Sequence, residues 1–163
     1  MHTWITVYIE PMTVAALQIL TAQMEEDMIT RTDSTQKIEA VSCTVRASFR
    51  EIDECFFDSN FVLQEDATPR FLMCTSMSDT TGSMQYVKIW TKAICEILML
   101  NPNAVLAAWQ ACDEEKARAE FLEKFNNALK EPWDCAVTVS PWSPSSRAPR
   151  ADVNIQNAAP AER

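Results

Sequence analysis

The chain has 163 residues, of which one is glycine (Gly82) and one is histidine (His2), and 14 Lys and Arg against 23 Asp and Glu give it a net charge of −9. So little glycine excludes phosphate-cradling loops, dinucleotide turns and nucleophile elbows, because these need close backbone approach or a positive φ angle. A single histidine leaves no pair of imidazoles for a zinc site and no evident base for a serine or cysteine nucleophile. We therefore expect a protein that is not an enzyme and that holds no cofactor.

The first predicted elements are a strand over residues 4–10 and a helix over residues 12–30. In the first segment Ile5, Val7 and Ile9 fall on one face and the residues between them on the other, which is the period of a strand. The segment is also rich in the β-branched and aromatic residues that strands favour. Pro11 ends this strand and can occupy the first turn of a helix. From Val14 to Met28 apolar residues recur every three or four positions, as on one face of an amphipathic helix.

The clearest strand pattern covers residues 41–50, where apolar and polar side chains alternate without interruption. Such alternation predicts a sheet with one dry and one wet face and favours antiparallel pairing. Two apolar islands, at residues 55–57 and 61–63, predict two short strands around a turn. Residues 71–77 predict another strand, which the polar turn at residues 78–82 closes.

A second helix is predicted from a cap at Ser83 to Leu100. Its apolar face consists of Met84, Val87, Trp90, Ile94, Ile97 and Leu98. Asn101 and Pro102 supply a cap and a first-turn proline for a helical region over residues 102–130, which is either one helix or two. After Pro132, residues 135–139 predict a last short strand.

In this order the elements predict an α+β fold, an antiparallel sheet packed by helices. The ferredoxin-like βαββαβ arrangement with an enlarged C-terminal helical region fits it best, and a meander sheet with a separate helical subdomain is the alternative. Residues 1–140 are expected to form a single domain. Residues 141–163 are rich in proline and poor in apolar residues, so we expect a tail that is disordered or ordered by a partner.

The six cysteines lie 12 to 23 residues apart and form no CxxC pair, which argues against a zinc site. We expect most of them to be buried and reduced, as small core residues. No segment approaches the roughly 18 consecutive apolar residues of a membrane helix. The first ten residues also lack the features of a signal peptide, so a cytoplasmic protein without a membrane partner is expected.

The most distinctive polar feature is a run of carboxylates with no basic residue between Arg50 and Arg70. Its members are Glu51, Asp53, Glu54, Asp58, Glu65 and Asp66. Their spacing matches no calcium-binding loop, and we expect no metal site among them. Like charges gathered in one region favour contact with a positive surface. We interpret the run as a partner-binding segment, with an ordinary solvated loop around a hairpin as the alternative.

These features predict a non-enzymatic inhibitor of the immunity-protein or phage anti-defence type. Through residues 51–66 it would occlude a basic surface of its target, such as a nucleic-acid-binding channel. An acidic cytosolic chaperone or adaptor that binds through an apolar sheet face or a helix groove is the alternative function. A third hypothesis, an enzyme, requires a reactive Cys55 thiol or a metal held by paired carboxylates.

Direct binding of nucleic acid is not expected, and the partner is expected to be another protein with a basic surface. Lys and Arg are scattered among acids, and the aromatic and glycine signature of RNA-recognition motifs is missing. Arg46 and Arg50, with Trp4 and Tyr8, are the one candidate basic and aromatic patch, although cross-strand pairing is the commoner use of such residues. The oligomeric state stays open, a dimer included.

Overall fold

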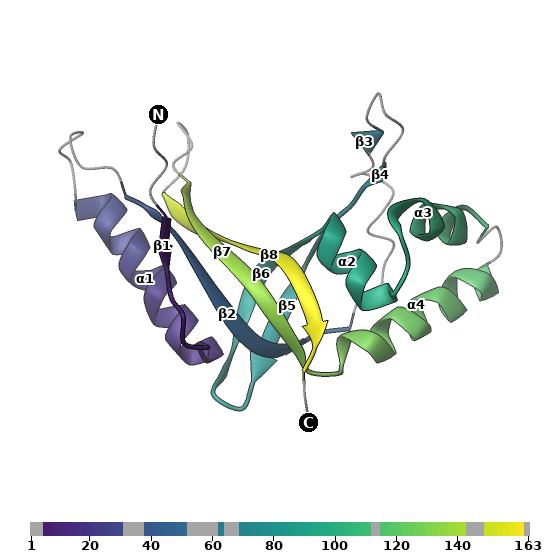
Figure 1. Ribbon diagram of the computed structural model, residues 1–163, viewed down its shortest axis with the longest axis horizontal. Helices are drawn as coiled ribbons and strands as arrows, with labels where there is room; N and C mark the ends of the chain where they lie inside the picture. Colours follow the sequence, from purple (N-terminus) through teal and green to yellow (C-terminus); the bar gives the residue numbers. More distant parts are fainter. Residues whose placement is uncertain are drawn as a thin grey trace.

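The computed structural model describes residues 5–30, 38–51, 62–63, 69–111, 115–142 and 149–161. Within these ranges the centre is a barrel of five strands. One long helix lies along one side of the barrel and three helices lie on the other (Figure 1). The barrel strands are β2 (Ala40–Phe49), β5 (Leu72–Asp79), β6 (Gly82–Trp90), β7 (Trp133–Trp142) and β8 (Arg150–Pro160).

The barrel is closed because each of these strands pairs with two others. The order is β2, β5, β6, β8 and β7, and β7 pairs with β2 again. The pairing of β6 with β8 is parallel and the others are antiparallel. A closed, five-stranded mixed barrel with a helical insertion is the arrangement of the OB-fold.

The predicted antiparallel sheet of ferredoxin-like βαββαβ type is therefore wrong. The difference arises at residues 83–90, which the sequence predicts as helix but which belong to β6. Met84 and Val87 are three positions apart, as on a helix face. That spacing comes from a β-bulge, where two residues of β6 oppose one residue of β5. The extra residue changes the period of two into an apparent helical spacing.

The expected disordered tail is a second difference, because Arg150–Pro160 form β8. Val153 and Ile155 of this strand are buried in the core. The strand pairs with β6 on one side and with β7 on the other. Because of these two neighbours, a few inward apolar side chains are enough to hold it in the barrel. Residues 143–148, 162 and 163 of the expected tail lie outside the described part of the chain.

The N-terminal segment covers the edge of β2 that β5 leaves unpaired. The short strand β1 (Ile5–Val7) pairs in parallel with the start of β2, and Met12 bridges to Val45 farther along it. Helix α1 (Val14–Thr30) follows and packs against the barrel, with Val14 and Leu17 fully buried.

The β5–β6 hairpin caps α1. The N–H of Val14 donates to the Asp79 carboxylate at 2.9 Å, and the N–H of Ala15 donates to the Thr81 hydroxyl at 3.0 Å. Burial alone would raise the pKa of the Asp79 carboxyl. Hydrogen bonds from the Thr81 hydroxyl and from backbone N–H groups outweigh it and hold that pKa below its ordinary value.

The helical insertion between β6 and β7 consists of three helices, namely α2 (Thr91–Leu98), α3 (Pro102–Gln110) and α4 (Glu115–Leu129). Helix α2 buries most of its length against the barrel, whereas α3 and α4 project away from it (Figure 1). The Asn101 side chain caps α3 by accepting from the N–H of Ala104 at 2.8 Å, as predicted. Residues 102–130, which the sequence predicts as either one helix or two, thus form two helices.

A separate pair of short strands, β3 (Val62–Leu63) and β4 (Pro69–Arg70), lies outside the barrel.

Four cysteines fall within the described residues and all four are free thiols. Burial raises the pKa of Cys43 and Cys95 to about 11 and that of Cys135 to about 12. These three are core residues of low reactivity. Cys74 differs because it is exposed on β5. Cys55, on which the enzymatic hypothesis depends, lies outside the described residues.

Among the residues that the structure describes, no helix combines the length and the apolar character that crossing a membrane requires.

Candidate functional site

The structure describes one carboxylate of the predicted acidic segment. Glu51 is the one described member, and its exposed carboxylate forms an ion pair with Lys130. The other five, Asp53, Glu54, Asp58, Glu65 and Asp66, lie outside the described residues. The segment belongs to the connection from β2 to β5.

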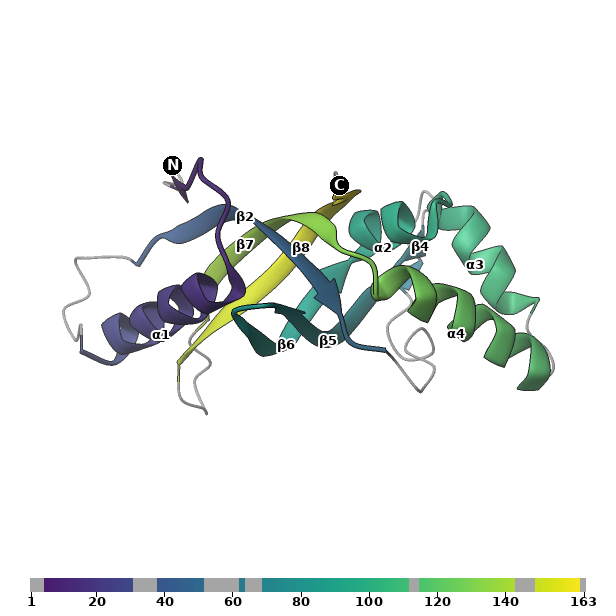
Figure 2. The same ribbon diagram turned by 90° about the horizontal axis from the view of Figure 1, so that it is seen from below.

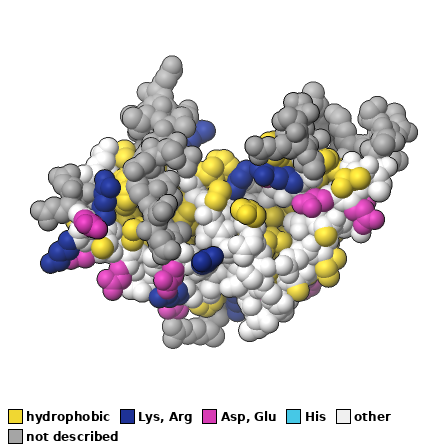
Figure 3. All heavy atoms as spheres, turned by 180° about the vertical axis from the view of Figure 1, so that it is seen from behind, with side chains coloured by type: hydrophobic (Ala, Val, Ile, Leu, Met, Phe, Trp, Pro, Cys, Tyr) yellow, Lys and Arg dark blue, Asp and Glu magenta, His cyan; other side chains and the backbone are white. Residues whose placement is uncertain are grey.

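A different surface gathers exposed aromatic and basic side chains, on the outer faces of β5, β6 and β8. Tyr86, Lys88 and Trp90 belong to β6, and Tyr86 is 87% exposed while Trp90 is 38% exposed. β5 and β6 lie on the far side of the barrel from β1 (Figure 2). Seen from that side, Lys and Arg side chains lie next to hydrophobic ones in the middle of the view (Figure 3). We call this the β5–β6 face.

The β-bulge places Tyr86 on this face. Gln85 and Tyr86 together oppose Ser76, between the pairs formed by Thr75 with Val87 and by Met77 with Met84. Tyr86 has a φ of 60°, in the left-handed region that a bulky residue rarely adopts. The Gln85 side chain accepts a hydrogen bond from the Ser76 hydroxyl at 2.8 Å, which ties the bulge to β5. A bulge of this kind re-aims a side chain, here an aromatic ring into solvent.

Two hollows lie on either side of Tyr86. One, of about 330 Å³, is lined by Lys88 and Arg150 among others. The second, of about 310 Å³, is lined by Arg50 and Glu51 among others. Cys74, Gln85 and Tyr86 line both, so they form the wall that the hollows share.

The basic groups of the first hollow share one carboxylate. Lys88 Nζ lies 3.5 Å from Asp152 Oδ2, and Arg150 Nε lies 3.2 Å from Asp152 Oδ1. All three side chains keep part of their surface exposed. Glu25 of α1 also lines this hollow, where its carboxylate accepts from the N–H of Ala151 at 3.2 Å, so the hollow holds two cations and two carboxylates.

Trp90 and Trp142 extend the aromatic surface toward β8 and β7. The Trp90 indole donates to the Asn154 side chain at 2.8 Å, which fixes the orientation of its ring. The guanidinium of Arg150 lies 4.2 Å from the centre of the Trp142 ring, in a cation–π contact. Trp142 and Arg150 stand at the two ends of the β7–β8 connection, and Trp142 stays 37% exposed.

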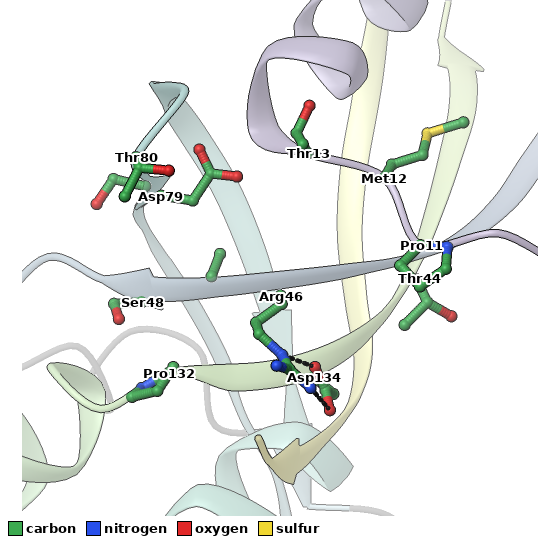
Figure 4. Close-up of a pocket in the computed structure, with 12 residues that line it drawn as sticks. Pro11, Met12, Thr13, Thr44, Arg46, Ser48, Asp79, Thr80, Pro132 and Asp134 are labelled. Atoms are coloured by element: carbon green, nitrogen blue, oxygen red, sulfur yellow. Dashed lines mark hydrogen bonds and ion pairs between the residues drawn. The ribbon is translucent and has the colours of Figure 1, made fainter. Parts of the chain in front are cut away.

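A larger hollow, of about 740 Å³, lies elsewhere, between the N-terminal segment, β2 and β7 (Figure 4). Arg46 and Asp134 face each other in it and form a bidentate ion pair, with distances of 2.8 and 3.2 Å. This pair joins neighbouring strands, so Arg46 serves cross-strand pairing and not a patch with Tyr8. Trp4 of that expected patch lies outside the described residues.

Within the described ranges, no three or more His, Cys, Asp or Glu side chains lie close enough together to hold a metal ion. The chemistry available on the β5–β6 face is therefore stacking on aromatic rings, hydrogen bonding and attraction of anions. In OB-fold barrels the corresponding face, with the connections that correspond to β2–β5 and β7–β8 here, binds oligonucleotides and oligosaccharides.

Comparison with solved structures finds the same fold in replication protein A. The chain aligns with a chain of a replication protein A heterotrimer bound to single-stranded DNA, with a TM-score of 0.63 and 11% identity over 96% of this chain and 37% of that chain. It aligns with a chain of yeast replication protein A bound to single-stranded DNA with a TM-score of 0.57 and 13% identity, over 96% of this chain and 90% of that chain. The protein thus spans little more than a third of the first of these chains. At such identities the likeness concerns the fold.

No protein-family model matches this sequence, and no curated protein matches it either.

The structural neighbours overturn the expected partner, which was another protein with a basic surface and no direct nucleic acid. In both neighbours the protein of this fold was solved on single-stranded DNA. The total charge and the scatter of Lys and Arg along the chain do not show which basic groups meet in the fold. The barrel brings Lys88 and Arg150 together from 62 positions apart, which that count does not reveal.

Proposed function

We propose that this protein binds single-stranded DNA across the β5–β6 face of its OB-fold barrel. The observation that carries the proposal is the set of exposed rings of Tyr86, Trp90 and Trp142 beside the cations of Lys88 and Arg150 on that face. Aromatic rings that stack with bases, next to cations that follow the phosphates, are the common device of proteins that bind single strands.

The stacking surfaces favour a single strand over a duplex. In a duplex the flat faces of the bases are covered by their neighbours, whereas a single strand can turn them toward protein rings. Each base that stacks on an aromatic side chain contributes about 1 to 3 kcal/mol. The replication protein A structures of the same fold, both bound to single-stranded DNA, support this choice of ligand.

The proposal is tested by fluorescence anisotropy of a labelled oligothymidylate titrated with wild-type protein and variants. Trp142→Ala removes a ring and is expected to weaken binding about tenfold, the low end of the stacking range. Lys88→Gln removes a phosphate contact and is expected to weaken binding a few fold, less at high salt than at low salt.

The matched controls are Tyr8→Ala and Lys124→Gln, which remove an exposed ring from the N-terminal segment and a cation from α4. Both should bind like the wild type. The proposal fails when the wild type does not bind the oligonucleotide, or when the control variants lose as much affinity as the site variants. A competing duplex and a competing single-stranded RNA of the same length establish which nucleic acid is preferred.

The inhibitor and the chaperone or adaptor functions expected from the sequence stay predictions, as does the absence of catalysis. The segment that the inhibitor hypothesis uses is described at Glu51 alone. A cytoplasmic location is part of the present proposal.

A further inference from the structure

We infer that Tyr86 is a wedge that separates two successive nucleotides of the bound strand and seats one in each of the two hollows beside it. This inference rests on the proposed function and adds the position and spacing of two nucleotide subsites. It is carried by the bulge, by the exposure of the ring and by the hollows on both sides of it.

The first step concerns the backbone. A tyrosine at a φ of 60° in the middle of a strand is strained, because its Cβ crowds the following carbonyl. Regular pairing of β6 with β5 would avoid this strain and would leave no residue unpaired. The structure keeps the strain and thereby sends an 87% exposed ring outward. Strain of this kind concentrates at functional sites, where it is part of the mechanism.

The second step concerns the two hollows. Tyr86 lines both, and they are nearly equal in size, at about 330 and 310 Å³. An aromatic ring on the wall between two such spaces offers one face to each. A strand that crosses this wall has to break the stacking between two neighbouring bases, and each base regains a stacking partner on the tyrosine ring.

The third step concerns charge. The hollow on one side of Tyr86 has Lys88 and Arg150 in its lining, beside two carboxylates. The hollow on the other side has Arg50, beside the carboxylate of Glu51. A basic side chain on each side of the ring matches a chain that carries one phosphate per nucleotide. The occupant for which both hollows and the ring are suited is therefore a flexible strand of flat bases whose phosphates can reach these basic groups.

An abasic scan tests the inference. The shortest oligothymidylate that the wild type binds at full affinity is prepared with one abasic site at each position in turn. The affinity of the wild type is expected to fall about tenfold when the abasic site occupies either of two adjacent positions, those whose bases stack on Tyr86. Tyr86→Asn keeps the bulge, because asparagine tolerates the left-handed region, but it has no ring. This variant should bind the complete oligonucleotide about tenfold more weakly and should no longer distinguish those two positions. Tyr86→Phe should restore the wild-type scan.

The outcomes separate the two proposals. When the wild type binds no single-stranded DNA, the proposed function fails and the inference with it. When the wild type binds but Tyr86→Asn keeps the same two sensitive positions, the wedge is wrong and the proposed function stands. A 2-aminopurine base placed at either sensitive position gives a reading without any variant. Stacking on the tyrosine should quench its fluorescence, whereas an increase on binding at both positions would overturn the wedge.

Discussion

At the scale of single residues, the molecule uses a few side chains whose role depends on geometry more than on identity. Tyr86 and Trp90 look like members of an amphipathic helix in the sequence, and Trp142 and Arg150 look like parts of a tail. In the barrel Tyr86 and Arg150 line one hollow, and Arg150 contacts the Trp142 ring. In the sequence only weak signals point to this surface, namely the two prolines near Trp142 and the aromatic residues that flank Lys88.

Strain at Tyr86 predicts an unusual order of stability. Tyr86→Gly and Tyr86→Ala both remove the ring and differ in a single Cβ, which is strained at a φ of 60°. The glycine variant is therefore expected to have a free energy of unfolding about 1 kcal/mol higher than the alanine variant. Urea unfolding of both variants at pH 7 measures this difference in the free energy of unfolding. At an ordinary strand position alanine is the more stable of the two, and that order here would show that the backbone is not strained.

At the scale of elements, the sequence predicts β1, α1, β2 and β5 well, because uninterrupted periods of two or of three to four mark them. It fails at β6, where the bulge imitates a helical spacing, and at β8, where neighbouring strands supply the apolar contacts. Both failures concern strands whose partners are distant in sequence or irregular in register. Because β6 and β8 carry most of the β5–β6 face, a sequence prediction that misses these two strands also misses the site.

The cap of α1 gives a prediction that depends on pH. Asp79→Ala removes the carboxylate that accepts from Val14 and is expected to lower the free energy of unfolding by about 1 kcal/mol at pH 7. Since the pKa of Asp79 is lower in the folded state than its ordinary value, its stabilisation is complete above about pH 4 and is lost as the pH falls through the folded value. The difference between wild type and variant should therefore shrink as the pH falls below about 4.

Urea unfolding of both proteins at pH 7, 5 and 3 and near pH 2 provides the measurement. Thr80→Ala, in the exposed turn of the same hairpin, is the control and should change the stability by less than about 0.5 kcal/mol. A destabilisation by Asp79→Ala that persists undiminished near pH 2 would show that the carboxylate charge does not stabilise the helix.

At the scale of the whole molecule, a chain with a net charge of −9 repels nucleic acid at long range. The proposed binding on the β5–β6 face therefore depends mainly on stacking, because the basic groups of both hollows have carboxylates beside them. The barrel makes this arrangement possible, because it collects aromatic and basic residues from β6, β7 and β8 onto one side. Glu51, after the end of β2, lines one of the hollows, which places a charge of the same sign as the phosphates next to the proposed path of the strand.

The most direct test of the account is the rate at which Cys74 is alkylated, followed by peptide mass spectrometry with and without DNA. Cys74 is exposed and lines both hollows beside Tyr86, whereas Cys43, Cys95 and Cys135 are buried with raised pKa values. Saturating single-stranded DNA is predicted to slow alkylation of Cys74 severalfold, and duplex DNA of the same length is predicted to leave the rate unchanged. An unchanged Cys74 rate at saturating single-stranded DNA would contradict binding at the β5–β6 face.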